Sequence, residues 1–432
     1  MPLTEIGILA VVVFLFLLFI RVPIGFAAMI VTVIGTSIII SPGPALAQLG
    51  GHTVRITLNY GLSVVPLFVL MGTILTKVNL GADLFEVLNS VLGRRKGGMA
   101  LATIAAGGAF SAVSGSVVAS VATLTPACVP EMRKYNYDAG FATGVTAVSA
   151  AFGVVIPPST ALVIYGFLTE ESIGQVLMGG ILPGIMIMVL LMLTVPVILK
   201  FKPEYAPVRA EKVPFPWKTF RYVWAVPAIF ILSFGGIYAG LFTPTEAGAV
   251  GAFLSIIFGL ITRRLTFKIM IESLSTAAKV TAMVFFMIIG GTMFGMLLTR
   301  SLLPMQIASF IVGLDVAPTT IMLLILALYT FLGLFMEEMA TLIILTPIFY
   351  PIVIGMGYSG IWFGVMTIMM KISGFITPPV GLITLLGSAM AGVPSSQVFK
   401  AQWPFYVTVI LSCIILIFFP QIATFLPDLM FG

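Results

Sequence analysis

Residues 153–159 read GVVIPPS, and residues 374–380 read GFITPPV. The two proline pairs lie 221 residues apart, and four more prolines of each half align at the same offset: Pro23 with Pro244, Pro126 with Pro347, Pro130 with Pro351, and Pro183 with Pro404. Six pairs align in total, whereas chance would align about one among the 27 prolines of the 432 residues. The sequence therefore predicts two repeats with matching helix breaks, which is typical of secondary transporters.

The composition restricts the class of protein further. The chain is 60% hydrophobic and 8% charged, with a mean hydropathy of +1.19, so the sequence predicts an all-α polytopic membrane protein. The net charge of +6 comes from basic residues in short loops, where they set orientation in the bilayer rather than bind nucleic acid. The motifs typical of metalloproteases, serine hydrolases and P-loop NTPases do not occur, so we expect no enzymatic activity.

Each half contains five apolar spans in the same order. The expected spans of the first half are 5–20, 24–41, 56–77, 139–168 and 176–199. Their counterparts in the second half are 226–241, 245–262, 277–298, 360–389 and 397–420. A polar linker at 200–221 joins the halves and is expected to be cytoplasmic.

Two segments are too long for one simple span, residues 97–132 and 318–353. Three basic residues precede the first segment and two follow it, and the positive-inside rule places both of its ends on the cytoplasmic side. The segment is therefore expected to enter the bilayer and return as a re-entrant hairpin. Five crossings per half then require the second half to be inverted, with its hairpin entering from the periplasmic face and both chain termini outside. Arg55 and Arg300 are exceptions to this topology.

The stretches 80–93 and 301–314 precede the two hairpins and contain few apolar residues for a span. We expect them to form helices at the membrane surface, with ordinary connecting loops as the alternative. His52, the only histidine, follows two glycines and is expected to lie in an extracellular loop without a specific role.

Each proline pair interrupts a span at a depth where lipid offers the backbone no hydrogen-bond partners. Proline lacks an amide donor and clashes with the preceding turn, so carbonyl groups upstream of it lose their hydrogen bonds. Such oxygens, when they point inward beside a hairpin turn, suit a dehydrated Na⁺. The alternative interpretation is a structural kink that binds no ion. This alternative is less favoured for two equivalent proline pairs than it would be for a single pair.

Polar groups at membrane depth are further candidates. Ser114 and Ser116 lie at the turn of the first hairpin, where hydroxyl groups and helix N-terminal amides suit a cation or an anionic substrate group. Close helix packing is the alternative explanation for the small residues around them. Glu337, Glu338 and Lys371 are ionisable groups in apolar surroundings. Lys371 is expected either to neutralise a glutamate of the second hairpin or to hold the carboxylate or sulfonate of a substrate.

Several short motifs together resemble one known family. Residues 110–116 read FSAVSGS, residues 156–159 read IPPS, and residues 243–247 read TPTEA. With YG at 165–166 and TPPVG at 377–381, the combination resembles the large membrane (M) subunit of TRAP (tripartite ATP-independent periplasmic) transporters. The resemblance spans nearly the whole chain.

This resemblance implies an elevator-type transporter of the ion transporter superfamily, in which a scaffold holds a mobile transport domain built from both hairpins and both broken helices. It implies coupling to Na⁺ at two or more sites, and no organic cofactor. By motif position, one Na⁺ would be bound by Ser114, Gly153, Ile156 and Pro158, and a second by Gly374, Thr377 and Pro379. Most of these ligands would be backbone carbonyl groups. Substrate contacts are expected at Ser116, Ser159, Lys371 and Glu338.

The expected domains follow the same division. They are 1–93 (scaffold helices and a surface arm), 94–175 (first half of the transport domain), 176–300 (scaffold helices with the linker 200–221), 301–315 (second surface arm), 316–395 (second half of the transport domain) and 396–432 (C-terminal helix). The resemblance also implies two partners, a small four-helix membrane subunit and a periplasmic substrate-binding protein.

The predicted function is Na⁺-coupled secondary uptake of a small organic anion across the bacterial inner membrane. A stand-alone Na⁺/carboxylate symporter without a binding protein is the first alternative, and a passive channel is the second. Where the family often has an asparagine after the second proline pair, this chain has Ile383 and Thr384, and this position is expected to face the substrate.

Overall fold

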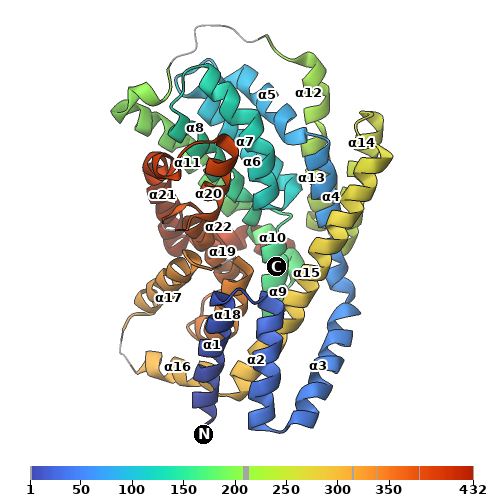
Figure 1. Cartoon of the computed structure of the whole chain (residues 1–432), viewed down its shortest axis with the longest axis vertical. Helices are drawn as coiled ribbons and strands as arrows, with labels where there is room; N and C mark the ends of the chain where they lie inside the picture. Colours follow the sequence, from blue (N-terminus) through green and yellow to red (C-terminus); the bar gives the residue numbers. More distant parts are fainter. Residues whose placement is uncertain (1, 208–213, 314–315, 337, 379, 432) are drawn as a thin grey trace.

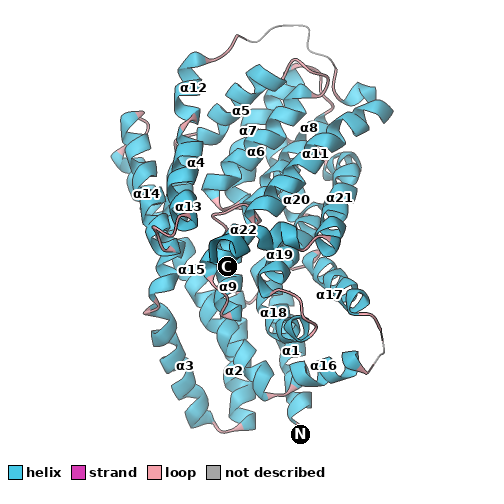
Figure 2. Cartoon of the chain, turned by 180° about the vertical axis from the view of Figure 1, so that it is seen from behind, coloured by secondary structure: helices cyan, strands magenta, loops and turns pink. Residues whose placement is uncertain are grey.

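The computed structural model describes residues 2–207, 214–313, 316–336, 338–378 and 380–431, and every regular element in these ranges is a helix (Figure 2). The chain begins with α1 (Leu3–Phe19), α2 (Ile24–Ile39), α3 (Pro42–Thr57), the 3-10 turn η1 (Tyr60–Ser63), α4 (Val64–Lys77) and α5 (Leu80–Leu92). The rest of the first half comprises α6 (Gly98–Ser114), α7 (Val117–Lys134), α8 (Ala139–Ala150), η2 (Ala151–Val154), α9 (Thr160–Thr169), α10 (Ile173–Gly179), α11 (Ile181–Phe201) and η3 (Pro203–Tyr205).

The second half is also helical in its described residues. It comprises α12 (Trp217–Val223), α13 (Ala225–Tyr238), α14 (Pro244–Ile261), α15 (Phe267–Arg300), α16 (Leu303–Val312), α17 (Pro318–Gly333), α18 (Glu338–Gly355), α19 (Gly360–Ile376), α20 (Leu382–Ala391), α21 (Ser395–Phe418) and α22 (Gln421–Phe431). Seven helical stretches of the described chain are long and apolar enough to cross a membrane.

Helix boundaries recur at the offset of the proline pairs. α7 begins at Val117 and α18 begins at Glu338, and the two helices end at Lys134 and Gly355. Both boundaries are therefore 221 residues apart. Figure 1 shows the pair α6 and α7 in the upper half of the molecule and the pair α17 and α18 in the lower half.

Two features of the helix pattern differ from the sequence prediction. Residues 42–57, which the predicted spans left out, form α3, and His52 lies in this helix rather than in a loop. α3 was missed because its polar residues lower its hydropathy below that of a span, although one face of it packs against α2 and α15. The C-terminal helix predicted at 396–432 is two helices, because the chain leaves helical geometry at Phe419 and Pro420.

The stretches predicted as surface arms do form helices, α5 and α16, rather than loops. α5 packs against both helices of the first hairpin, and α16 contacts the second hairpin through α18. Their position at a membrane surface stays a prediction.

The helices form two groups. In the first group α2 and α4 pack against α15, and α4 also packs against α14. In the second group the hairpin helices pack with α8, α9, α19, α20 and α21. Contacts of α4 with α6 and of α15 with α18 join the groups. The domain boundaries stay a prediction, but α11 contacts α6 and α21, which favours placing it with the hairpins.

Small residues allow the close packing of the first group, and large apolar residues face outward. On α2 a Cβ at Gly25 would lie 2.7 Å from the Phe286 carbonyl oxygen of α15, so the two helices approach closely at this point. The exposed face of α2 carries large apolar residues at every fourth position, at Phe26, Ile30, Ile34 and Ile38. Such a stripe is typical of a helix that faces lipid.

Arg264, in the turn between α14 and α15, connects three segments. Its guanidinium group forms an ion pair with the Asp83 carboxylate on α5, donates to the Val78 carbonyl oxygen at 3.1 Å, and lies 4.3 Å from the centre of the Tyr222 ring. Burial raises the pKa of the Asp83 carboxyl group, and the hydrogen bond and charge of Arg264 oppose this rise. Arg264 thus holds α5 against the α14–α15 turn.

Replacing Arg264 by alanine is expected to destabilise the protein by about 1–3 kcal/mol, because a mostly buried Asp83 carboxylate would lose its partner. The loss should shrink as the pH falls, since protonation of Asp83 removes the buried charge and its raised pKa brings protonation closer to neutral pH. Unfolding in detergent at two pH values measures both effects. Arg263→Ala, at the exposed neighbouring position, is the control, and equal losses for the two variants would contradict the role of Arg264.

Candidate functional site

The first hairpin turns at the serines singled out in the sequence. α6 ends at Ser114, Gly115 has a φ of +62°, and α7 begins at Val117. Ser116 is the N-cap of α7, and its hydroxyl oxygen accepts from the Ala119 amide at 3.3 Å. The Ser114 hydroxyl lies 3.0 Å from that of Ser120. The turn is therefore ordered by its own side chains.

The first proline pair breaks the helix, as the sequence predicts. α8 ends at Ala150, η2 covers Ala151–Val154, and α9 begins only at Thr160. Ser159 is 1% exposed, and its hydroxyl donates to the Val154 carbonyl oxygen at 2.6 Å and accepts from the Leu162 amide at 3.2 Å. Ser159 thus caps α9 and fastens the break, and its predicted contact with substrate stays a prediction.

The turn of the first hairpin lies directly against this break. A Cβ at Gly153 would be 3.2 Å from the Ser116 carbonyl carbon and 3.3 Å from the Val117 amide nitrogen. A Cβ at Gly115 would collide with the Pro158 carbonyl oxygen. Glycines on both sides therefore allow backbone to meet backbone, and they bring together the segments of four residues assigned to the first Na⁺ site.

Those four residues have different surroundings. The Ser114 carbonyl oxygen faces Gly72 of α4, where a Cβ would collide with it. The Ile156 side chain packs against Gly184 of α11, and its amide donates to the Phe152 carbonyl oxygen at 2.9 Å. The structure thus gathers these segments, while Na⁺ binding by them stays a prediction.

The second break has the same relation to the second hairpin. α19 ends at Ile376, Thr377 is extended, and α20 begins at Leu382. A Cβ at Gly374 would lie 2.5 Å from the carbonyl oxygen of Gly333, the last residue of α17. Gly374 is the 221-residue counterpart of Gly153, so both hairpins meet a break at an equivalent glycine.

The other residues assigned to the second Na⁺ site are only partly placed. The Thr377 hydroxyl donates to the Ser373 carbonyl oxygen at 2.6 Å, one turn back along α19. Pro379 lies outside the described residues, as does Glu337 of the second hairpin.

Lys371 connects α19 to the turn of the second hairpin. The side chain is 1% exposed, and its Nζ donates to the Met336 carbonyl oxygen at 2.9 Å and to the Thr341 hydroxyl at 2.8 Å. These acceptors lie on the two sides of the hairpin turn, and Glu338, which is 6% exposed, lies between them. Lys371 therefore holds the hairpin; its predicted contacts with substrate and with either glutamate stay predictions.

Nearly the whole chain matches one family of known proteins. Residues 11–422 match the family described as "Tripartite ATP-independent periplasmic transporter, DctM component". The chain belongs to this family. The resemblance based on the short motifs is therefore confirmed, and this TRAP large permease is a multi-pass protein of the inner membrane.

Relatives of the permease cover most of its length. It is 32% identical over 425 residues to the sialic acid TRAP transporter permease protein SiaT of Haemophilus influenzae, over 98% of this chain and 68% of the relative. It is 34% identical to the isethionate TRAP transporter permease protein DctMQ of Oleidesulfovibrio alaskensis, over 85% of this chain and 58% of the relative. In fold it is similar to the crystal structure of the Alcanivorax borkumensis YdaH transporter, with a TM-score of 0.64 at 16% identity, covering 86% of this chain and 87% of that chain.

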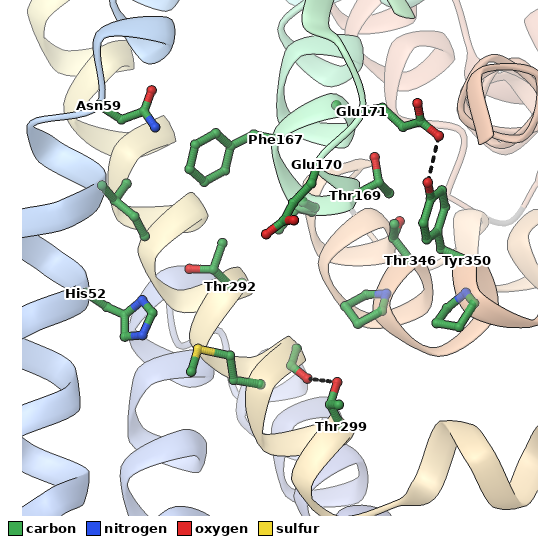
Figure 3. A pocket seen from close by; sticks show the side chains of 18 of the residues that line it. His52, Asn59, Phe167, Thr169, Glu170, Glu171, Thr292, Thr299, Thr346 and Tyr350 are labelled. Carbon is green, nitrogen blue, oxygen red and sulfur yellow. Dashed lines mark hydrogen bonds between the residues drawn. The ribbon is translucent and has the colours of Figure 1, made fainter. Parts of the chain in front are cut away.

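A cavity of about 830 Å³ lies between the two helix groups of the permease, and sequence reasoning did not predict it. Figure 3 shows His52 and Asn59 on one side of it, Thr292 on α15, and Glu170 and Tyr350 across from them. Arg55 and Arg300, the exceptions to the predicted topology, also line it. Both arginines lie on the outer side of the predicted topology, against the positive-inside rule. This exception was the one signal in the sequence for the cavity.

The position after the second proline pair lies in the helix packing. Ile383 and Thr384 are fully buried, and the Thr384 hydroxyl donates to the Gln402 side-chain oxygen at 2.8 Å. Gln402 in turn donates to the Gly144 carbonyl oxygen of α8 at 3.1 Å. Thr384 and Gln402 therefore connect α20 to α21 and α8, and the expected contact of Ile383 and Thr384 with the substrate stays a prediction.

Proposed function

We propose that this permease is the transport subunit of a Na⁺-coupled system that takes up a small organic anion across the inner membrane. The observation that carries the proposal is the contact of each hairpin with a helix break, at Gly153 in the first half and at Gly374 in the second. The first contact brings the hairpin turn against the non-helical backbone of the break, and the second brings the end of α17 against the last turn of α19, just before its break. Carbonyl groups in such a position are the ligands that a dehydrated Na⁺ prefers.

The first Na⁺ is proposed to bind between the Ser114–Ser116 turn and the break at 153–158. The supporting geometry is the collision that any Cβ at Gly115 would have with the Pro158 carbonyl oxygen, because it leaves no room for a side chain between the two segments. The second Na⁺ is proposed to bind near Gly374 and Thr377, where the hairpin backbone approaches as closely. Cation binding at either place would hold a hairpin against its break.

The substrate is proposed to be a carboxylate or a sulfonate. The two relatives support this class, because their names specify sialic acid, which carries a carboxylate, and isethionate, which carries a sulfonate. Each Na⁺ that moves inward gains about 2.3 kcal/mol per 100 mV of membrane potential. Two Na⁺ ions would therefore bring a monoanion inward with a net positive charge, and the potential would drive accumulation.

An elevator movement of two inverted repeats is the proposed mechanism. It is supported by helix boundaries that recur after 221 residues and by the two hairpins that lie in opposite halves of the molecule (Figure 1). The helices α2, α4, α14 and α15 would form the fixed scaffold, and the hairpins with the broken helices would move as one body. Binding of ions and anion in this one body would couple their movements.

Two partners complete the proposal. A small four-helix membrane subunit would pack against the scaffold, and a periplasmic binding protein would deliver the anion. Membership in a family described as tripartite and periplasmic supports both. A stand-alone symporter without a binding protein is the alternative. Uptake with and without the binding protein separates it from the tripartite system.

Uptake of radiolabelled isethionate and sialic acid into proteoliposomes tests the proposed function. With the membrane subunit and the binding protein present, an inward Na⁺ gradient is expected to accumulate one of the two anions at least tenfold above equilibrium, because two Na⁺ supply the driving force. A K⁺ gradient should not replace it. Accumulation without the binding protein would favour the stand-alone symporter, and equilibration without accumulation would indicate a channel.

A further inference from the structure

A polar stripe runs along α3, which is otherwise an apolar helix. Its members on the helix are spaced by four and three residues, so they share one face: Gln48, His52 and Arg55. At 1.5 Å per residue the stripe extends for roughly 10 Å, and Asn59 follows just beyond the end of α3. His52, Arg55 and Asn59 line the 830 Å³ cavity between the two helix groups. The polar face of α3 is therefore directed at the cavity rather than at lipid.

A second helix adds to this basic wall. Arg300, the last residue of α15, donates from Nη1 to the Gln48 side-chain oxygen at 2.9 Å, which fixes its guanidinium group beside the stripe. His52, Arg55 and Arg300 line the same cavity, so the three basic side chains form one cluster. We call His52, Arg55 and Arg300 the basic wall.

The opposite side of the cavity has the opposite charge. The Glu171 carboxylate accepts a hydrogen bond of 2.6 Å from the Tyr350 hydroxyl and is thereby held toward α18. Glu170 has a φ of +60° and is directed into the cavity (Figure 3). An anion that enters the cavity would be repelled by Glu170 and attracted to the basic wall.

We propose that the basic wall is a capture site for the carboxylate or sulfonate group of the substrate, on the side of the scaffold from which the substrate is delivered. This inference rests on the proposed function for the direction of transport. A cleft with one wall of positive charge and low-dielectric surroundings concentrates anions and speeds their entry. It also explains why Arg55 and Arg300 stay on the outer side of the predicted topology, against the usual distribution of basic residues.

A simpler role for the arginines makes a different prediction. Arg55 and Arg300 lie in the last turns of α3 and α15, where a basic residue stabilises the negative end of the helix dipole. If this were their only role, their loss would lower stability without changing the apparent affinity for substrate. Kinetics and stability therefore separate the two explanations.

Uptake kinetics of the double variant Arg55→Gln/Arg300→Gln give the first test. Its KM for the transported anion is expected to rise about tenfold at low salt with little change in maximal rate, and the difference should shrink at high salt, where the field is screened. The double variant Arg263→Gln/Lys279→Gln removes the same charge at exposed positions on another part of α15 and its preceding turn, and should keep the wild-type KM. A wild-type KM for the first variant would overturn the proposal.

The variant Glu170→Gln gives a change of opposite sign. It removes the repulsion across the cavity, so its KM should fall below the wild-type value by about two- to threefold. In the alternative, Glu170 and the arginines form a charge pair whose only role is to close the cavity. Loss of the arginines and loss of Glu170 would then both weaken this pair. Changes of KM in the same direction for both variants would therefore overturn the capture site.

Chemical labelling tests the site without any transport. Phenylglyoxal modifies the arginines of the wild-type permease in Na⁺-free buffer, with and without isethionate or sialic acid. The anion is present at roughly 10–50 mM, the range for a weak electrostatic site. Peptide mass spectrometry then identifies the modified arginines. Arg55 and Arg300 should be protected and Arg263 should not. Protection without Na⁺-driven uptake would overturn the proposed function alone, whereas Na⁺-driven uptake without protection would overturn the capture site alone.

Discussion

Replacing Gly115 by alanine is expected to reduce Na⁺-driven uptake to background. A Cβ at this position would collide with the Pro158 carbonyl oxygen, and a backbone oxygen cannot move aside as a flexible side chain can. The left-handed φ of +62° adds a conformational cost of roughly 1–2 kcal/mol. The hairpin turn would be pushed away from the break, and the proposed Na⁺ ligands would separate. Uptake into proteoliposomes under a Na⁺ gradient measures the loss.

Gly392 offers a matched control for Gly115. It has a nearly identical φ of +64°, but no heavy atom lies within 4 Å of where its Cβ would be. Gly392→Ala therefore carries the conformational cost without the collision and should transport at close to the wild-type rate. Na⁺ should raise the thermal unfolding midpoint of the wild type and of Gly392→Ala but not that of Gly115→Ala. Na⁺-driven uptake by Gly115→Ala at the wild-type rate would contradict the proposed Na⁺ site at this contact.

The second large effect is expected for Lys371→Met. Methionine keeps much of the apolar stem but removes the donors to the Met336 carbonyl oxygen and the Thr341 hydroxyl. Because Lys371 is 1% exposed, water cannot replace these hydrogen bonds, and the protein should lose about 3 kcal/mol of stability. The second hairpin would lose its connection to α19, so uptake should fall to background. Thermal unfolding and uptake are measured on the same preparation.

Two further variants test whether the effect is specific to Lys371 and how much its hydrogen bond to Thr341 contributes. Lys279→Met removes an exposed lysine from α15 and should change neither stability nor uptake. Thr341→Val removes one acceptor of Lys371 and should cost about 1 kcal/mol while some uptake remains. A stable and fully active Lys371→Met would exclude the residue both as an anchor of the hairpin and as a substrate contact.

The order of helices and the positions of the breaks were predictable because their causes are local. A proline removes a donor and clashes with the preceding turn wherever it occurs, so the breaks before α9 and after α19 could be inferred from the residue types alone. The turn at Ser114–Ser116 was predictable for the same reason, since Gly115 accepts a left-handed φ at no steric cost. α3 was not predictable, because a helix with a polar face has a low mean hydropathy and cannot be distinguished from a loop by its hydropathy pattern.

The partners of individual polar side chains were not predictable from the sequence. Ser159 caps α9 and Thr384 donates to Gln402, and the residue types alone specified neither partner. Each hydroxyl forms the bond that its neighbours in space offer, because a buried hydroxyl without a partner is costly. Which neighbours these are depends on the packing of α8, α20 and α21.

The sequence by itself determined that this chain is a membrane transporter with a helix broken in each half, because apolar composition and proline spacing act through short-range effects of bilayer and backbone. The tertiary structure alone decided which surfaces meet at those breaks and where the charges converge. Gly115 meets Pro158, and Arg300 meets Gln48 across 252 residues, only because the helices between them pack in one arrangement. That arrangement depends on many weak contacts at once, and no short stretch of residues specifies it.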